Sequence, residues 1–144
     1  MQDLTLIIPT KKEAESLPLF LEELDRIDCV KLIVLQKDDL NTKEAIKNIS
    51  NIKIIEQIHN GYGNALIEGI NATKTNYCCI INADGSMDPK YLNEMYENCK
   101  DKDLIFASRY QKPGGGSNDD DIITLVGNYF FTTLGNIFFK LNIS

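Results

Sequence analysis

The chain has 144 residues, of which 43% are apolar and 25% charged, and its formal net charge is -6 at pH 7. This length and composition predict one folded domain with a buried core, and they exclude a disordered or collagen-like chain. The negative charge gives no electrostatic basis for nonspecific nucleic-acid binding.

The cysteines and the N-terminal sequence bear on the compartment. Cys78 and Cys79 lie in an apolar run, where free cysteines pack as small apolar side chains, and none of the four cysteines has CxxC spacing. This usage indicates a reducing, cytosolic compartment. The opening MQDLTLIIP lacks the basic region of a signal peptide, and no uninterrupted apolar run reaches the ~20 residues of a membrane span.

Short apolar runs rich in β-branched residues recur along the chain. They are typical of strands covered on both faces, and they occupy residues 4–9, 31–36, 52–58, 77–82 and 103–109. Helical patterns fill the gaps, so we expect an α/β sandwich with a mostly parallel sheet.

The helical patterns have recognisable starts. Leucines at 17, 21 and 24 predict the first helix, and Asn41 with Glu44 predicts a capping box before the second. The third follows the glycine-rich stretch at 61–63, and Asp88 with Pro89 is a strong opening for the fourth.

The C-terminal residues differ in character from the rest. Residues 122–144 are apolar around most of a helical circumference, and such a helix needs a partner or a membrane surface to cover it. We therefore divide the chain into a core at 1–120 and an apolar helix at 121–144, which we expect to begin a membrane-proximal or acceptor region of a longer chain.

Three polar segments, PTKKE, NADGS and SRYQKPGGG, each follow a predicted strand and are expected to share one crevice. In the second, Asp84 follows its strand directly, with Asn82 and Ser86 two residues away on either side. Mg²⁺ typically takes one or two carboxylates and completes its shell with substrate phosphates, so Asp84 fits a metal site. A simple turn is the alternative, since Asp, Gly and Ser are standard turn residues.

Two further features have weaker signals. A glycine-rich helix start such as Gly61 and Gly63 can receive an anion, but the dinucleotide and P-loop patterns are absent. His59 is interpreted as a solvated loop residue. Arg109 suits phosphate binding, with a surface linker as the alternative, and for Lys112 the linker interpretation is favoured.

Four stretches in this order resemble the family 2 glycosyltransferases of the GT-A fold. They are LIIPTKKEAESLPLFLEEL, GYGNALIEGI, INADGSMDPKYLNEM and DLIFASRYQKPGGG. The resemblance is closest to the dolichyl- or polyprenyl-phosphate sugar transferases. It implies a three-layer α/β/α sandwich, a nucleotide-diphosphate sugar donor, Mg²⁺ or Mn²⁺, and a polyprenyl-phosphate acceptor.

The resemblance also implies roles for individual residues. It places Pro9, Lys11, Glu13 and Gln36 at the nucleotide, Asn82 and Ala83 near the ribose and sugar, Asp84 and Ser86 at the metal, and Arg109 at the phosphates, with Asp84 and Arg109 as the catalytic residues.

This sequence departs from the family pattern at the donor side. Gln36 and Lys37 stand where the family usually has acids that contact the base and ribose, and Asp38 and Asp39, two residues later, are a candidate shifted substitute for them. Asn82 replaces the first acid of the metal motif. Lys11 and Lys12 replace the usual aromatic residue and asparagine. These departures leave the nucleotide base and full activity open.

Three functions therefore remain. The chain transfers a sugar to a polyprenyl phosphate, or it transfers to a saccharide or other hydroxyl, or it is a non-catalytic binding domain of the same fold. A phosphate acceptor is already an anion at pH 7, which matches the lack of a candidate catalytic histidine. The expected location is the cytoplasmic face of a membrane or the cytoplasm. We expect no nucleic-acid partner, and a homo-oligomer is left open.

Overall fold

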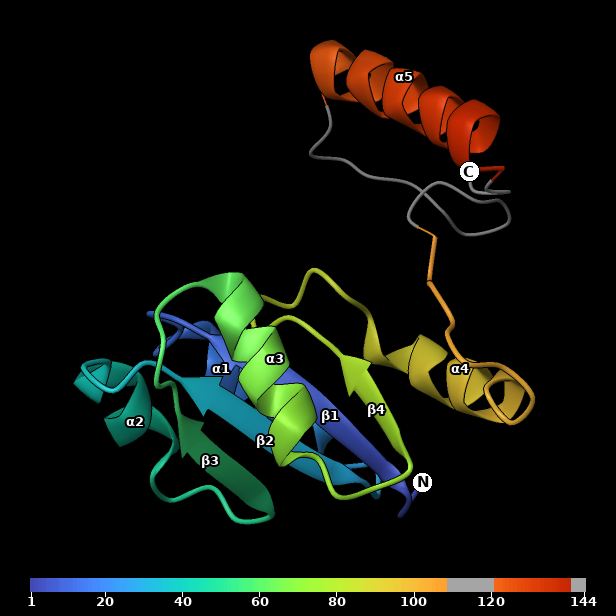
Figure 1. The fold of residues 1–144 in the computed structure, drawn as a ribbon. Coiled ribbons are helices and arrows are strands. Elements are labelled where there is room, and N and C mark those ends of the chain that lie inside the picture. Colours follow the sequence, from blue (N-terminus) through green and yellow to red (C-terminus); the bar gives the residue numbers. More distant parts are fainter. Residues whose placement is uncertain (109–120, 141–144) are drawn as a thin grey trace. The chain divides into compact units, whose positions relative to one another are not determined.

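A parallel four-stranded sheet forms the centre of the fold (Figure 1). The computed structural model describes residues 1–108 and 121–140, and the chain divides into two compact units, Met1–Tyr96 and Glu97–Ser144. The strands of the first unit are β1 (Leu4–Thr10), β2 (Val30–Leu35), β3 (Ile52–Glu56) and β4 (Tyr77–Ile80). Their order is β3-β2-β1-β4, with all three pairings parallel, so the predicted α/β class is confirmed.

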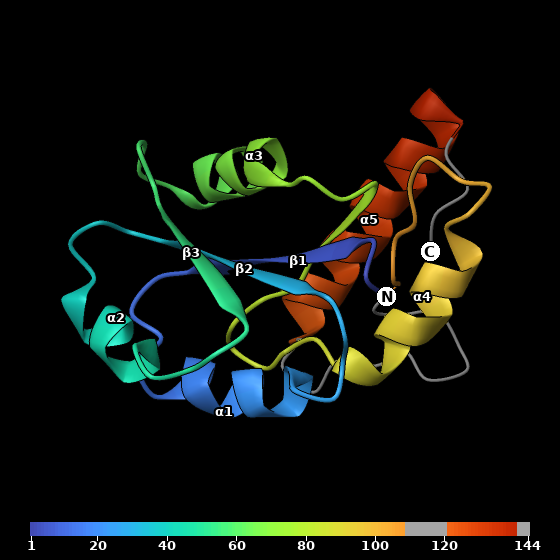
Figure 2. The same cartoon turned by 90° about the horizontal axis from the view of Figure 1, so that it is seen from below.

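Helices cover both faces of this sheet. They are α1 (Ser16–Leu24), α2 (Leu40–Ile46), α3 (Tyr62–Ala72) and α4 (Leu92–Asn98), the last preceded by a one-turn 3-10 helix at Pro89–Tyr91. Figure 2 shows α1 and α2 on one face and α3 on the other. Parallel strands need crossover connections, and α1, α2 and α3 supply them from β1 to β2, from β2 to β3 and from β3 to β4.

The central strand β1 organises two cores. All seven of its residues are buried, and alternate side chains point to opposite faces. Leu6 and Ile8 join the core that includes the buried leucines of α1, whereas Ile7 joins the smaller core with Val34 and Ala65. Each fully buried Leu or Ile stabilises the fold by roughly 1.5–3 kcal/mol relative to exposure.

The smaller core brings α3 very close to the sheet. A Cβ atom placed on Gly69 would lie 2.5 Å from Cγ2 of Ile7 and 3.1 Å from Cγ2 of Val34. Both neighbours are fully buried, so their methyl groups have no open space to move into. Glycine at position 69 therefore sets the distance between α3 and strands β1 and β2.

The four predicted strands that lie in the first unit are confirmed with small shifts at their ends, but the predicted capping box is wrong. The N-cap of α2 is Asp39, whose side chain accepts a hydrogen bond from the backbone N–H of Thr42, and Asn41 lies inside the helix. An aspartate three residues before a helical N–H is itself a complete cap, so the helix begins two residues earlier than the Asn41 pattern indicated.

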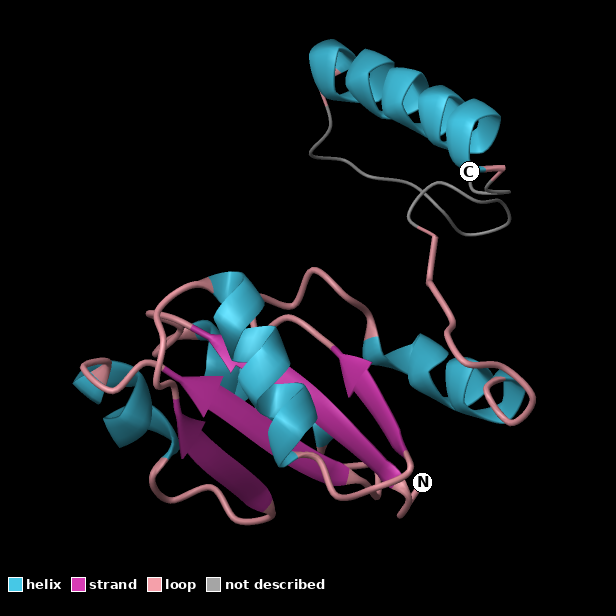
Figure 3. Ribbon diagram, in the orientation of Figure 1, coloured by secondary structure: helices cyan, strands magenta, loops and turns pink. Residues whose placement is uncertain are grey.

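The predicted fifth strand is also wrong over its described part. Residues 103–108 form no strand and appear as loop in Figure 3. Leu104 and Phe106 are 67% and 81% exposed. A strand exists through ladder hydrogen bonds with a neighbour, and an apolar run alone supplies no such neighbour. Position 109 lies outside the described residues.

The second unit contains the predicted C-terminal helix, α5 (Ile122–Phe139). Asp121 caps it by accepting a hydrogen bond from the N–H of Thr124 at 2.7 Å. Within this described helix no side chain is buried, and its exposed residues include Phe130, Phe131 and Phe138. Among the described residues it is the one helix long and apolar enough to cross a membrane.

Candidate functional site

The loops that follow the four strands open on one edge of the sheet, because the strands are parallel. Thr10 at the end of β1 pairs with Leu35 at the end of β2, and Leu35 pairs with Glu56 at the end of β3. The N–H of Ile81 donates to the carbonyl of Ile7, which carries the ladder one residue beyond β4. PTKKE and NADGS therefore lie at the same edge of the sheet, which the predicted shared crevice requires, while SRYQKPGGG lies outside the described residues from Arg109 onward.

The structure places the predicted site residues at different depths. Pro9 and Ala83 are buried, so they shape the edge from beneath, whereas Glu13, Gln36 and Asn82 are half-buried. The exposed members are Lys11, Asp84 and Ser86. His59 is exposed in the loop after β3, as expected for a solvated loop residue. Arg109, like Lys112, lies outside the described residues.

The loop after β1 is tied to the loop after β2. The backbone N–H of Lys12 donates to Oδ2 of Asp39 at 2.6 Å, and the N–H of Glu13 donates to Oγ1 of Thr42 at 3.1 Å. The Thr42 hydroxyl in turn donates to Oδ2 of Asp39 at 2.9 Å. Burial would raise the pKa of Asp39, but the hydrogen bonds from Lys12 and Thr42 outweigh it, and the pKa lies below its ordinary value.

A tyrosine contacts Asn82, which the resemblance places where an acid is usual. The hydroxyl of Tyr62, the first residue of α3, donates to Oδ1 of Asn82 at 3.0 Å. An aspartate at position 82 would offer acceptors alone, whereas the amide offers two donor hydrogens as well. Position 82 therefore presents a neutral, mixed donor and acceptor group to this edge.

Asp84 sits in a tight turn, as the alternative interpretation predicted. Its Oδ1 accepts a hydrogen bond from the N–H of Ser86 at 3.0 Å, and Gly85 between them has φ +72°. The turn and a metal role are compatible, because the turn holds an exposed carboxylate and an exposed hydroxyl two residues apart at the edge.

The side chains available as metal ligands fit one kind of metal site. Among the described residues, no group of three or more His, Cys, Asp or Glu side chains is placed to hold a metal ion. A structural zinc site is thus not formed by this part of the chain. One carboxylate with a neighbouring hydroxyl suits Mg²⁺ or Mn²⁺, whose remaining ligands would be diphosphate oxygens and water.

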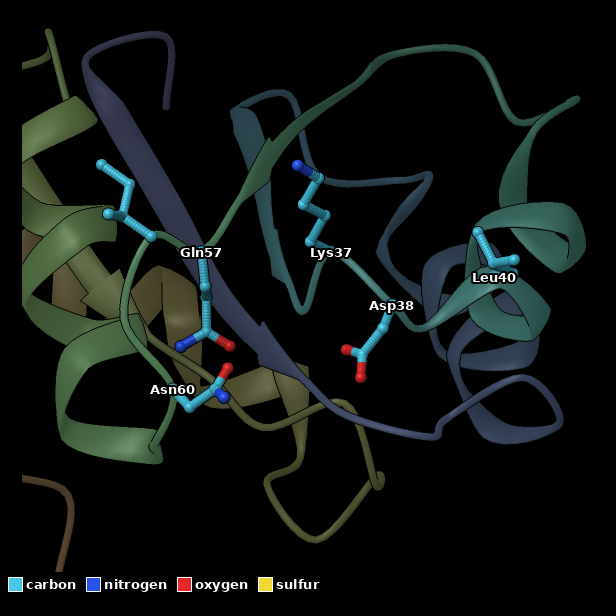
Figure 4. A pocket seen from close by; sticks show the side chains of 6 residues that line it. Lys37, Asp38, Leu40, Gln57 and Asn60 are labelled. Atoms are coloured by element: carbon cyan, nitrogen blue, oxygen red, sulfur yellow. The ribbon is translucent and has the colours of Figure 1, made fainter.

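A shallow depression lies at the ends of β2 and β3 (Figure 4). Its volume is about 570 Å³, and its lining comprises Lys37, Asp38, Leu40, Gln57, Ile58 and Asn60. In Figure 4 the amides of Gln57 and Asn60 lie near each other, with Lys37 and Asp38 on the neighbouring loop. Gln36, predicted at the nucleotide, is half-buried beside this lining, whereas Lys37 and Asp38 are exposed on it.

The loop that carries Asn60 is fixed by its own hydrogen bonds. The carboxylate of Glu68 accepts from the N–H groups of Ile58 at 2.8 Å and His59 at 2.9 Å. The backbone bond from His59, and then that from Ile58, lowers the pKa of Glu68. Nε2 of Gln57 donates to the carbonyls of His59 and Gly61. The depression therefore has an ordered wall.

Sequence reasoning missed the contacts that several of these residues make. Asp39 and Thr42 had a detectable signal, because an Asp three residues before a helical N–H is a cap pattern. Tyr62 and Glu68 had none, since their partners lie in segments that are brought together by the fold.

An open parallel α/β sheet with polar loops at its carboxyl edge is the architecture shared by many nucleotide-binding α/β proteins. The chain belongs to glycosyl transferase family 2, whose family model matches residues 5–143. It is a glycosyltransferase domain whose parallel sheet and helices agree with the α/β GT-A fold. Such an enzyme binds a nucleotide-sugar donor and an acceptor, and members of this family commonly use a divalent metal.

Proposed function

We propose that the chain transfers a sugar from a nucleotide-diphosphate donor to a polyprenyl (dolichyl) phosphate at the cytoplasmic face of a membrane. The observation that carries the donor half is the meeting of the predicted donor segments, PTKKE and NADGS, at one edge of a parallel sheet. In such sheets ligands bind beyond the carboxyl ends of the strands.

The donor would lie across the ends of β1, β2 and β4. In this arrangement Pro9 and Ala83 form the floor, and Lys11, Glu13 and Gln36 surround the nucleotide. Asn82, oriented by Tyr62, donates an amide hydrogen to a ribose or sugar oxygen. The cation of Lys11 offsets part of the diphosphate charge. Arg109 lies outside the described residues, so its assignment to the phosphates rests on the sequence alone.

A divalent cation would be held by Asp84, with Ser86 beside it, and when bound it would neutralise charge on the leaving diphosphate. The Gly85 turn keeps the Asp84 carboxylate exposed at the edge. The acceptor phosphate is already anionic at pH 7, so the chain's own groups need to position it and not to deprotonate it.

The acceptor half of the proposal is supported by α5. Its eighteen residues are long and apolar enough to cross a membrane, and none of them is buried. A helix with many exposed large apolar side chains is costly in water, so a lipid surface is a suitable cover. A polyprenyl phosphate presents its phosphate at such a surface.

Thermal shift with GDP-, UDP- and CDP-sugars, with and without Mn²⁺, tests the donor site. We expect at least one nucleotide sugar to raise the melting temperature, with a further rise in Mn²⁺. Asp84→Asn keeps an oxygen for the N–H of Ser86 but removes the charge, so the Mn²⁺ increment should disappear. Asp28→Asn, at the opposite edge of the sheet, is the matched control and should retain it. If no nucleotide sugar raises the melting temperature, the proposed donor site is refuted.

Transfer assays test the acceptor. The donor identified above, radiolabelled in its sugar, is incubated with vesicles that contain polyprenyl phosphate, with vesicles that lack it, and with soluble saccharides. Label in the lipid fraction, dependent on polyprenyl phosphate, is expected. Label in the saccharide fraction instead would establish a hydroxyl acceptor.

One observation favours a second candidate, a non-catalytic donor-binding domain. Asn82 and Gln36 are neutral where the family usually has acids, which removes charge from the donor side. Nucleotide binding without label in any acceptor fraction would identify this function.

A further inference from the structure

We propose that Asp39 and Thr42 form a latch that holds the loop after β1 in its donor-binding conformation, and that Asp39 is a positioning residue and not a donor ligand. The inference rests on the proposed donor site. It gives Asp39 a positioning role in place of the direct base or ribose contact that a shifted substitute for the family's acids would make.

The latch joins two loops that are far apart in sequence. Oδ2 of Asp39 receives the N–H of Lys12 at 2.6 Å and the hydroxyl of Thr42 at 2.9 Å, while Oδ1 receives the N–H of Thr42 at 3.2 Å. The Thr42 hydroxyl also accepts from the N–H of Glu13 at 3.1 Å. Two consecutive N–H groups of the first loop are thus held by two side chains at the start of α2.

The first loop has a conformation that requires such support. Lys12 has φ +60°, in the left-handed region that is unfavourable for a residue with a side chain. A backbone of this kind persists where its surroundings fix it, and it is concentrated at functional sites. Here the bend separates Lys11 from Glu13, two residues assigned to the nucleotide, so the latch determines where both side chains emerge.

The burial of Thr42 separates positioning from direct contact. Thr42 is 0% exposed, so it cannot touch a bound nucleotide. Any effect of its hydroxyl on donor affinity must pass through Asp39 and the backbone of the first loop. The oxygens of Asp39 already receive three hydrogen bonds from the protein, which occupy about three of a carboxylate's roughly four acceptor sites.

Three variants of the latch test the proposal. Asp39→Ser keeps a good helix cap but is too short to reach the N–H of Lys12. Thr42→Val keeps the branched shape but removes the hydroxyl, and Thr42→Ser restores it. Affinity is measured by calorimetry with UDP, GDP and CDP in Mn²⁺, and hydrogen exchange is measured at the amides of Lys12 and Glu13.

The matched control is Asp3→Ser. Asp3 makes a comparable long-range contact, accepting from the N–H of Asn76 at 3.0 Å and from its side-chain amide at 2.7 Å. This contact joins the residues that precede β1 and β4, at the edge opposite the donor loops. Its loss loosens the fold in a similar way without touching the first loop.

We expect Asp39→Ser and Thr42→Val to weaken nucleotide binding at least tenfold and to speed exchange at Lys12 and Glu13, while Thr42→Ser and Asp3→Ser stay within about twofold of the parent. Parent-like affinity in Thr42→Val, or an equal loss in Asp3→Ser, would overturn the positioning role. If the parent chain binds no nucleotide, the proposed function fails. Hydrogen exchange at the amides of Lys12 and Glu13 then still tests the latch separately. Unchanged exchange in Asp39→Ser would show that Asp39 does not hold the loop after β1.

Discussion

Gly69→Ala is the sharpest test of how α3 is seated on the sheet. Gly69 faces strand β1, and a Cβ atom there would lie 2.5 Å from Cγ2 of Ile7. Gly63 lies in the same helix, and a Cβ atom on it would meet nothing within 4 Å. Both glycines are in α3, so the two substitutions differ chiefly in whether the new methyl group has room.

The magnitude follows from two opposing effects. Overpacking a well-packed core costs about 1–3 kcal/mol, while replacing glycine with alanine in a helix interior stabilises by about 1 kcal/mol. Gly63→Ala gains part of the second effect alone, near the helix start. Gly69→Ala carries both effects, and the 2.5 Å approach to Ile7 puts its overpacking in the upper part of that range, about 2–3 kcal/mol. Its net loss relative to the parent is then about 1–2 kcal/mol, and its free energy of unfolding should fall below that of Gly63→Ala by about 1–3 kcal/mol.

Urea denaturation followed by circular dichroism measures both variants against the parent. We expect Gly63→Ala at or above the parent midpoint and Gly69→Ala below it, with similar slopes. A Gly69→Ala midpoint equal to that of Gly63→Ala would refute the close packing of α3 against Ile7.

Three further predictions concern single groups. Burial raises the pKa of the Cys79 thiol to about 11, so iodoacetamide at pH 7.5 should modify exposed Cys78 first, and equal labelling by mass spectrometry would contradict this. The pKa of Asp39 is below its ordinary value of 3.8. Its contribution to stability is therefore complete above pH 3.8 and is lost as the pH falls through the native pKa. An NMR titration midpoint for Asp39 above 3.8 would refute the lowered pKa. Gly85 has φ +72°, so Gly85→Val should cost about 1–2 kcal/mol and Gly85→Asn less, measured by denaturation.

Patterns along the chain predicted those parts of the fold that depend on local sequence. Apolar runs located β1 to β4 because burial on both faces demands continuous apolar sequence. The same rule failed at 103–108, where the run has the composition of a strand but no ladder partner in the described sheet. Composition indicates whether a segment can form a strand. Whether it does form one depends on whether the fold places another strand beside it.

The positions of two candidate site residues were predictable from the sequence, but the contacts around them were not. Asp84 and Asn82 followed from their place after a strand and from family resemblance. The contacts that orient them, such as Tyr62 with Asn82, join segments twenty residues apart in the chain. No periodicity or spacing rule encodes such a contact, because it depends on the distance between α3 and the end of β4.

The strand order has a consequence for how the site comes apart. β1 pairs over six residues with β2, which in turn pairs with β3, but it pairs over four residues with β4, whose outer edge has no ladder in the described sheet. The Asp39 latch joins the β1 and β2 loops, whereas Asn82 and Asp84 follow the short edge strand. Local opening should therefore release the proposed metal side of the site while the proposed nucleotide side stays folded, so that the two sides would open with unequal lifetimes.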